Sequence, residues 1–230
     1  QTQALRVFDF YGGGADAETK ASPLLRHAYL KMPGKQWALL AGQTWDVISP
    51  LVPKTVNYSV AWGEGNIGYR RPQVRFSTWA GIGERAKFTL DVAMTRNMGG
   101  DFAIAYNDTV SVTAGDGVDN GADAALPAIQ GRIGIASDFS EEGMLSVGIS
   151  GHYGQEKFDR KDMTDPVISV TEESIDSWSV NGDLTLKINR YLSLKGEFFT
   201  GQALGTYLGG ALQNTDGIYQ ALPTMGGHAM

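Results

Sequence analysis

Three arginines close together in this chain have the chemistry to bind carboxylates. Arg70 and Arg71 are adjacent, and Arg75 follows shortly after them. A guanidinium group is planar and permanently charged, and its parallel N–H groups match the two oxygens of a carboxylate or a phosphate. These residues therefore predict a site for small anions. In the alternative interpretation, Arg70 and Arg71 flank a membrane and contact lipid headgroups.

The segment 46–68, just before these arginines, has the composition of a loop that packs against the protein. Pro50 and Pro53 interrupt an apolar run, and such a loop is held by packing rather than left in solvent. We expect it to fold inward as a constriction loop beside the arginines. The residues expected to contribute to the constriction are Trp45, Asp46, Trp62, Glu64 and Tyr69.

Catalytic chemistry is poorly supported by the sequence. His152 has Ser146 and Ser150 nearby, but on one strand these side chains lie side by side, which disfavours a hydrolytic triad. Only 3 histidines and no cysteine are present, so a zinc site has few ligands to draw on. We therefore expect neither an enzyme nor a bound cofactor.

An acidic stretch at 116–123 is the candidate for calcium binding. Asp116, Asp119 and Asp123 carry the oxygen ligands that calcium prefers. Their spacing departs from the alternate acids of an EF-hand loop. A solvated acidic loop without metal is therefore the favoured interpretation.

Two-faced strands are the elements that must carry these side chains. Between 177 and 189, Trp178 and Leu184 belong to an apolar series that alternates without interruption with a polar series containing Asp183 and Lys187. Because the side chains of a strand alternate between its faces, this segment has one apolar and one polar surface. A soluble β-sandwich could show this pattern once. It recurs here, in 85–96, 129–135 and 144–153.

Long and short links between the expected strands alternate along the chain. The long links are 13–22, 46–68, 97–126 and 158–173, and the short ones are 32–35, 81–84, 138–143 and 189–190. In an antiparallel meander, alternate links lie at the same end of the sheet. Long loops at one end and tight turns at the other are typical of an all-β, antiparallel up-and-down transmembrane β-barrel. We accordingly expect 97–126 and 158–173 to be long extracellular loops.

The expected barrel is a single domain over residues 1–230 and is incomplete. We count about nine strands, an odd number, and residues 213–230 have the composition of a loop rather than of a closing strand. An open sheet edge in lipid leaves backbone groups unpaired, so further strands are expected.

Composition agrees with a barrel and disfavours other classes. The absence of cysteine suits assembly in the periplasm, and 30 glycines suit tight turns and curvature. No basic patch interleaved with aromatic residues suggests nucleic-acid binding. Aromatic residues near strand ends, among them Trp37, Trp79, Tyr153 and Tyr191, are candidates for girdles at the membrane interfaces.

The polar faces of the strands are interpreted as the wall of a water-filled pore. Basic residues outnumber acidic ones on this wall, although the formal net charge of the whole chain is −6. A basic wall concentrates anions, so the pattern predicts an outer-membrane porin for small anionic solutes. The wall charges are Arg75, Arg85, Lys87, Arg132, Lys187 and Lys195 against Asp91, Asp183 and Glu197.

Three other interpretations remain open from the residues alone. The wall charges could pair with one another and only keep the lumen wet. The barrel could be non-conducting, with a structural role or with acidic loops that bind partners or divalent cations. A soluble antiparallel sandwich is the third.

Four stretches carry a resemblance to a known family. Residues 25–29 (LRHAY), 40–46 (LAGQTWD), 49–50 (SP) and 65–75 (GNIGYRRPQVR) resemble the corresponding part of the DcaP-like outer-membrane porins of Gram-negative bacteria. The match is specific over 26–75 and is one of pattern from there to 202.

This resemblance implies a sixteen-stranded, homotrimeric barrel that passes small anionic molecules such as dicarboxylates through an outer membrane containing lipopolysaccharide. It also implies additional strands and, in some members, an N-terminal helical extension that this chain lacks.

Overall fold

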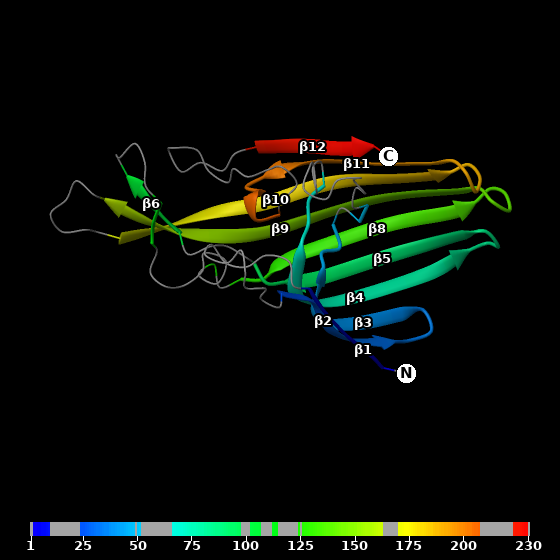
Figure 1. The fold of residues 1–230 in the computed structure, drawn as a ribbon, viewed down its shortest axis with the longest axis horizontal. Coiled ribbons are helices and arrows are strands. Elements are labelled where there is room, and N and C mark those ends of the chain that lie inside the picture. Colours follow the sequence, from blue (N-terminus) through cyan, green and yellow to red (C-terminus); the bar gives the residue numbers. More distant parts are fainter. Residues whose placement is uncertain are drawn as a thin grey trace.

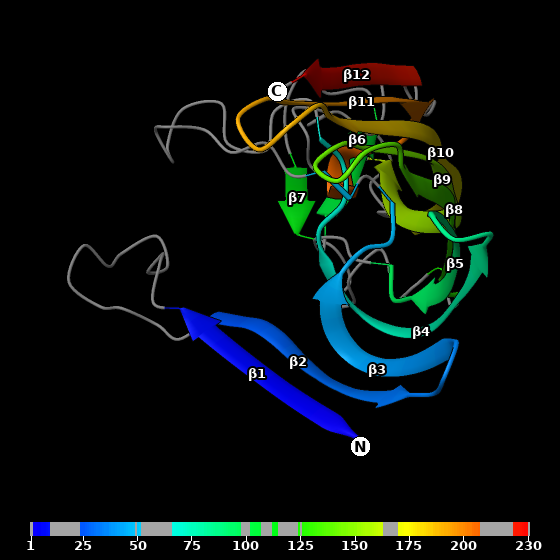
Figure 2. The same cartoon turned by 90° about the vertical axis from the view of Figure 1, so that its right-hand side faces the viewer.

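Ten of the described strands form one curved sheet of antiparallel pairs that follows the order of the chain, and two further short strands lie off this path, one of them parallel to its neighbour. The computed structural model describes residues 2–9, 24–48, 50–51, 66–97, 102–106, 112–114, 124, 126–162, 170–207 and 223–229. The sheet order is β1-β2-β3-β4-β5-β8-β9-β10-β11-β12, and the sheet curls around a central space (Figures 1 and 2). These strands are Gln3–Asp9, Leu24–Pro33, Trp37–Trp45, Arg70–Ile82, Ala86–Thr95, Ala128–Asp138, Met144–Asp162, Val170–Lys187, Ser193–Gln202 and Pro223–Ala229.

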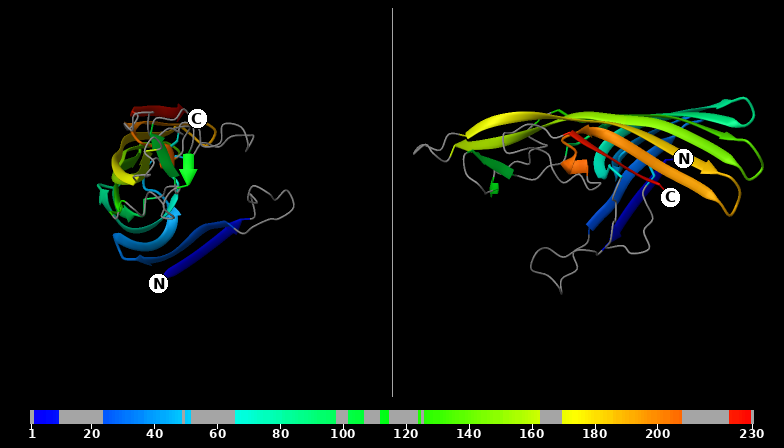
Figure 3. Two further views of the ribbon diagram at one scale, coloured as in Figure 1. Left: turned by 90° about the vertical axis from the view of Figure 1, so that its left-hand side faces the viewer. Right: turned by 90° about the horizontal axis from the view of Figure 1, so that it is seen from above.

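The expected up-and-down topology is confirmed. Tight turns join β2 to β3, β4 to β5, β8 to β9 and β10 to β11, and these turns lie at one end of the sheet (Figures 1 and 3). The opposite end is reached by the longer links. Within the described residues the sheet is not closed, because β1 and β12 form its two edges.

Three boundaries differ from the sequence-based expectation. Part of 213–230 is strand β12, which pairs antiparallel with β11 although its composition is that of a loop. Two short strands, β6 (Phe102–Tyr106) and β7 (Val112–Ala114), lie within the expected loop 97–126. Strands β9 and β10 extend well into the expected loop 158–173, which leaves 163–169 as their link. Backbone pairing with an adjacent strand accounts for all three, since it does not require alternating side chains.

Burial in this sheet is inverted relative to a soluble protein. On β10, Val180 is 51% and Leu184 44% exposed, whereas Asn181 and Asp183 between them are 3% and 8% exposed. The other strands repeat this arrangement, with large apolar side chains outside and polar ones inside. The exposed set includes Val74, Phe76, Val92, Met94, Ile129, Ile133, Ile149, Leu194 and Phe198. The apolar face therefore points outward, as the sequence predicts.

No helix in the described part of the chain has the length and apolar character needed to cross a membrane. The helical element there is the short 3-10 turn η1 (Gly205–Tyr207), which lies inside the curve of the sheet (Figure 3).

Most of the named aromatic residues lie on the outer face, but one does not. Trp37, Tyr153 and Tyr191 are exposed. Trp79 pairs with Thr89 and has the Lys87 ammonium 5.4 Å from its ring centroid, so it belongs to the lumenal face. Its place near a strand end suggested a girdle residue, but strand alternation gives it the face of Arg75. The girdle assignment of Trp79 is therefore wrong.

The two faces of β10 make opposite predictions for an inserted charge. Leu184→Arg places a cation in lipid and is expected to destabilise the folded barrel by about 2–4 kcal/mol if it lies near the bilayer midplane. Thr185→Arg, one residue along, places the same side chain on the lumenal face and is expected to cost much less. Denaturant titration in lipid vesicles measures both values. Equal costs would contradict the assignment of the faces.

Candidate functional site

The inner wall of the sheet is organised as rows of side chains at equal height. Cross-strand register places Phe199, Asn181, Ser150, Arg132 and Asp91 in one row. The next row toward the tight turns runs through Gly134, and the next row toward the longer links runs through Gln130. Because neighbouring strands are about 5 Å apart, side chains within a row contact one another directly.

A buried ion pair joins the end of β3 to the start of β4. Arg71 Nε donates to Asp46 Oδ2 at 3.0 Å, and both side chains are 1% exposed. The same carboxylate accepts hydrogen bonds from the Tyr69 amide at 2.8 Å and from Gln130 Nε2 at 2.9 Å. Asp46 therefore links the start of β4 to β8, although β5 lies between these two strands.

A second chain segment, which follows β11 near the opposite edge of the sheet, contacts the same ion pair within the lumen. Arg71 Nη2 donates to the Thr206 carbonyl at 2.8 Å, and the Arg71 guanidinium lies 3.7 Å from the centroid of the Tyr207 ring. The Gly68 amide donates to the Tyr207 carbonyl at 2.8 Å. Burial raises the pKa of the Tyr207 phenol, which keeps the ring neutral beside the cation.

The chain enters the lumen directly after β11. Ala203 has a φ of 53°, a left-handed conformation that turns the backbone away from the strand. Its carbonyl accepts a hydrogen bond from Ser177 Oγ at 2.9 Å. The neighbouring Thr206 donates from its hydroxyl to Glu156 Oε1 at 2.7 Å. Residues 203–207 are thus tied to the inner faces of β9 and β10.

His152 supports this inner segment rather than a catalytic serine. Its two ring nitrogens lie 2.7 Å from Ser179 Oγ and 3.0 Å from Ser177 Oγ, and its ring stacks on Tyr207 at 3.9 Å. Both serines belong to β10, and neither is Ser146 or Ser150, the serines whose pairing with His152 the sequence disfavours. Residues of adjacent strands contact one another more readily than residues two apart on one strand.

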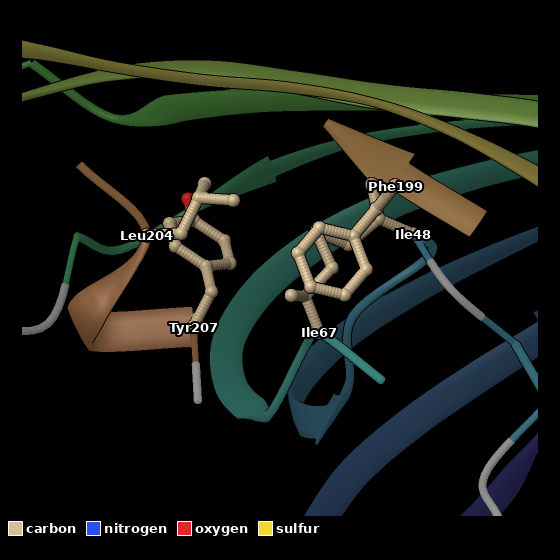
Figure 4. Packing of buried hydrophobic residues seen from close by; sticks show 5 residues of the cluster. All are labelled: Ile48, Ile67, Phe199, Leu204 and Tyr207. Carbon is tan, nitrogen blue, oxygen red and sulfur yellow. The ribbon is translucent and has the colours of Figure 1, made fainter. Parts of the chain in front are cut away.

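A small apolar cluster fills part of the space inside the sheet. Ile48, Ile67, Phe199, Leu204 and Tyr207 are each at most 1% exposed and pack together (Figure 4). The first two belong to the ends of segment 46–68 and the last two to the segment after β11. We call residues 46–48, 50–51, 66–69 and 203–207 the lumenal segments.

The described ends of segment 46–68 are hydrogen-bonded to the wall. The Val47 amide donates to Gln130 Oε1 of β8 at 3.1 Å, and the Leu51 amide donates to Glu197 Oε1 of β11 at 2.6 Å. These partners lie 83 and 146 residues away along the chain. The described start of the segment therefore extends from the end of β3 across the lumen to β11.

Arg70 and Arg71 do not form one site. By strand alternation Arg70 shares the face of Val74, while Arg71 shares the lumenal face of Arg75. The Arg70 guanidinium lies 4.6 Å from the Trp45 ring and 4.7 Å from the Tyr69 ring, and it is 6% exposed. It is held between these two aromatic residues at the rim of the outer face.

Arg75 is directed along the inner wall. Its Nε donates to Gln73 Oε1 at 2.9 Å, and its Nη2 donates to the same oxygen at 2.7 Å and to the Trp45 carbonyl. All these hydrogen-bond partners are neutral, so Arg75 forms no ion pair within the described residues. Gln73 in turn donates to the Thr44 carbonyl at 2.9 Å.

The wall charges nearer the tight turns divide into a paired and an unpaired group. Arg132 forms a two-pronged ion pair with Asp183, and Ser77 Oγ donates to Asp91. Within the described residues, Lys187 and Lys195 of the wall and Arg85, which lies in the turn between β4 and β5, form no ion pair, and Lys87 contacts the Trp79 ring. Asp183 is therefore neutralised by an arginine and Asp91 keeps its charge beside a neutral donor, but the bases without an ion pair outnumber it.

Some candidate residues lie outside the described part of the chain. These are Trp62 and Glu64 of the expected constriction loop and the calcium candidates Asp116, Asp119 and Asp123.

The sequence interpretation missed the residues that receive the lumenal segments. Neither the residue types nor the spacing of Gln130, Thr206 and Tyr207 single them out as a site. A signal for the second inward segment was present. Leu204 and Tyr207 are apolar or aromatic residues soon after a strand end, a composition like that of segment 46–68.

The outward apolar face, the polar lumen and the alternation of turns define a transmembrane β-barrel of the outer-membrane type. The structure is similar to the crystal structure of the outer membrane channel DcaP of Acinetobacter baumannii, with a TM-score of 0.56 and 19% sequence identity. The match covers 90% of this chain and 49% of that one, so the chain spans about half the length of the channel. The DcaP-like fold expected from residues 26–75 is thereby confirmed. No protein-family model and no curated protein matches the chain.

Removal of one partner of the buried ion pair tests how firmly the lumenal segments are held. Asp46→Ala leaves Arg71 charged and buried, so it is expected to lower the free energy of unfolding by about 3–5 kcal/mol. Asp176→Ala, which removes an exposed carboxylate on β10, is the control and is expected to cost far less. The double variant Asp46→Ala/Arg71→Ala is expected to lose less than the sum of the single losses. Additive losses in denaturant titrations would contradict the pairing.

Proposed function

We propose that the protein is a porin that lets small anionic solutes, dicarboxylates among them, diffuse passively across the outer membrane. The observation that carries the proposal is the uneven pairing of the wall charges. Asp46 and Asp183 are neutralised by arginines, whereas Lys187, Lys195 and Arg85 form no ion pair within the described residues. An excess of unpaired cations gives the lumen a positive potential, which concentrates anions there.

The source of this positive potential differs from the one that the sequence suggested. Arg71 and Arg132 are ion-paired, and Arg70 lies between two aromatic rings on the opposite strand face. The proposed anion preference therefore rests on the lysines, on Arg85 and on Arg75, whose partners are neutral. The similarity to an outer membrane channel supports passage through the barrel, and it leaves the solute to experiment.

The constriction is proposed to come from two directions. Segment 46–68 reaches across the lumen to Glu197, and residues 203–207 meet it at Arg71 and in the apolar cluster. Together they narrow the space that the sheet encloses. Assembly as a homotrimer and contact of the outer face with lipopolysaccharide are further parts of this proposal, since an apolar outer face suits lipid or a neighbouring barrel.

Ion selectivity tests the proposed role of the unpaired lysines. In planar bilayers with a salt gradient, the reversal potential of the unmodified protein is expected to show anion preference. The double variant Lys187→Glu/Lys195→Glu is expected to shift the reversal potential toward cation preference, because the two substitutions replace positive wall charges by negative ones. Lys35→Glu, in the β2–β3 turn and off the inner wall, is the matched control. Clear cation selectivity of the unmodified protein would overturn the proposal.

Shortening of segment 46–68 tests the proposed constriction. Deletion of residues 52–65, which the proposal assigns to the constriction loop, with Asp46, Ile48 and Ile67 retained, is expected to raise single-channel conductance. Deletion of the link 163–169 between β9 and β10 is the control and is expected to leave conductance unchanged. Stable silence of the unmodified protein in bilayers would instead favour a non-conducting barrel, an outcome consistent with the apolar cluster inside the sheet.

A further inference from the structure

Arg132 reaches its carboxylate by crossing an entire strand. Arg132 belongs to β8 and Asp183 to β10, and β9 lies between them. The guanidinium donates from Nε to Asp183 Oδ2 at 3.0 Å and from Nη2 to Oδ1 at 2.7 Å. Strands two apart are separated by about 10 Å, so the side chain must lie along the wall to make this contact.

A glycine on the intervening strand leaves room for this crossing. Gly148 of β9 is paired with Gly134 of β8 on one side and with Asp183 on the other. A Cβ at position 148 would overlap Arg132 Nη2 and Asp183 Oδ2. A Cβ at position 134 would lie 2.8 Å from Arg132 Nη1, closer than real Cβ contacts allow.

Backbone conformation does not explain these two glycines. The glycines with positive φ in the described residues are Gly42, Gly68 and Gly83, so Gly134 and Gly148 have conformations open to other residues. What distinguishes them is the arginine side chain that lies over them.

The direction taken by Arg132 supports the same interpretation. Asp91 lies directly opposite Arg132 on the adjacent strand β5, which makes it the nearer carboxylate by register. The Asp91 carboxylate instead accepts the Ser77 hydroxyl, and Arg132 extends the other way, over Gly148. The open glycine surface thus selects the partner two strands away.

We infer that Gly134 and Gly148 are positioning residues of the pore: they hold Arg132 flat against the wall, bound to Asp183, and so keep the side chain out of the conduction path. This inference rests on the proposed channel function for its effect on conductance. Its geometric part, the dependence of the ion pair on the two glycines, stands independently. The Arg132 charge is withheld from passing solutes, and the lumen at this height stays wider than the residue types alone suggest.

The test replaces Gly148 by alanine in the intact barrel and compares two backgrounds. Gly148→Ala is expected to lower the free energy of unfolding and to reduce single-channel conductance, since Arg132 is displaced into the lumen. In an Arg132→Ala/Asp183→Ala background the same substitution is expected to lose most of both effects, because both side chains that its Cβ would overlap are gone. Gly182→Ala on β10 is the matched control, since a Cβ there meets no atom within 4 Å.

The readouts separate this inference from the proposed function. A stability loss for Gly148→Ala that persists unchanged in the Arg132→Ala/Asp183→Ala background overturns the inference, whether or not the protein conducts. A coupled stability loss in a barrel that never conducts supports the geometry and overturns the porin proposal. If Gly148→Ala does not fold, Asp183→Asn releases Arg132 without a new atom on the wall. That variant is expected to conduct less and to prefer anions more strongly, and unchanged conductance and selectivity would overturn the inference.

Discussion

The absence of water from the bilayer core is the constraint on which this structure depends. A backbone group without a partner in lipid costs several kcal/mol, so the spanning chain must pair all of its N–H and C=O groups within the sheet. Regular pairing then forces strict alternation of side chains between lipid and lumen. Inward side chains therefore face a largely polar lumen, whereas those of a soluble fold would form an apolar core. The buried polar residues of β8, β9 and β10 follow from this inversion.

The polar interior explains why arginines here act mainly as structural groups. Arg71 joins the ends of β3 and β4 to the segment after β11, and Arg132 joins β8 to β10. Each connects elements that the backbone ladder does not pair. A guanidinium suits this role because its several donors can satisfy a carboxylate and a carbonyl at once, as Arg71 does with Asp46 and Thr206. The lysines near the tight turns, with a single flexible donor group, remain exposed to the lumen.

The parts of the fold that follow local rules could be predicted from the sequence, and the parts that depend on distant contacts could not. Alternation in 177–189 predicts Val180 outside and Asp183 inside, and the structure agrees. Once the outer face meets lipid, the alternating side chains can be assigned to the two faces of the strand in only one way. Strand β12 could not be predicted, because its pairing with β11 uses backbone groups that any residue supplies. The contacts that join Asp46, Arg71, Gln130 and Thr206 could not be predicted for a different reason. These residues come from the end of β3, β4, β8 and the chain after β11, and no spacing along the sequence brings them together.

The length of the apolar outer face of strand β10 indicates the thickness of the surrounding membrane. Apart from Gly182, its outward residues are apolar from Trp178 to Leu186, as is Ile188 just beyond its end, and the next outward residue before Trp178, Asp176, accepts hydrogen bonds from the Tyr153 hydroxyl and the Gln155 amide. At about 3.3 Å per residue and a tilt of about 40°, the span from Trp178 to Ile188 corresponds to about 25 Å of hydrocarbon. The rest of β9 and β10 then rises above the lipid. A bilayer of ordinary thickness, about 30 Å, would have to thin around this wall, so the strand itself favours a thin membrane.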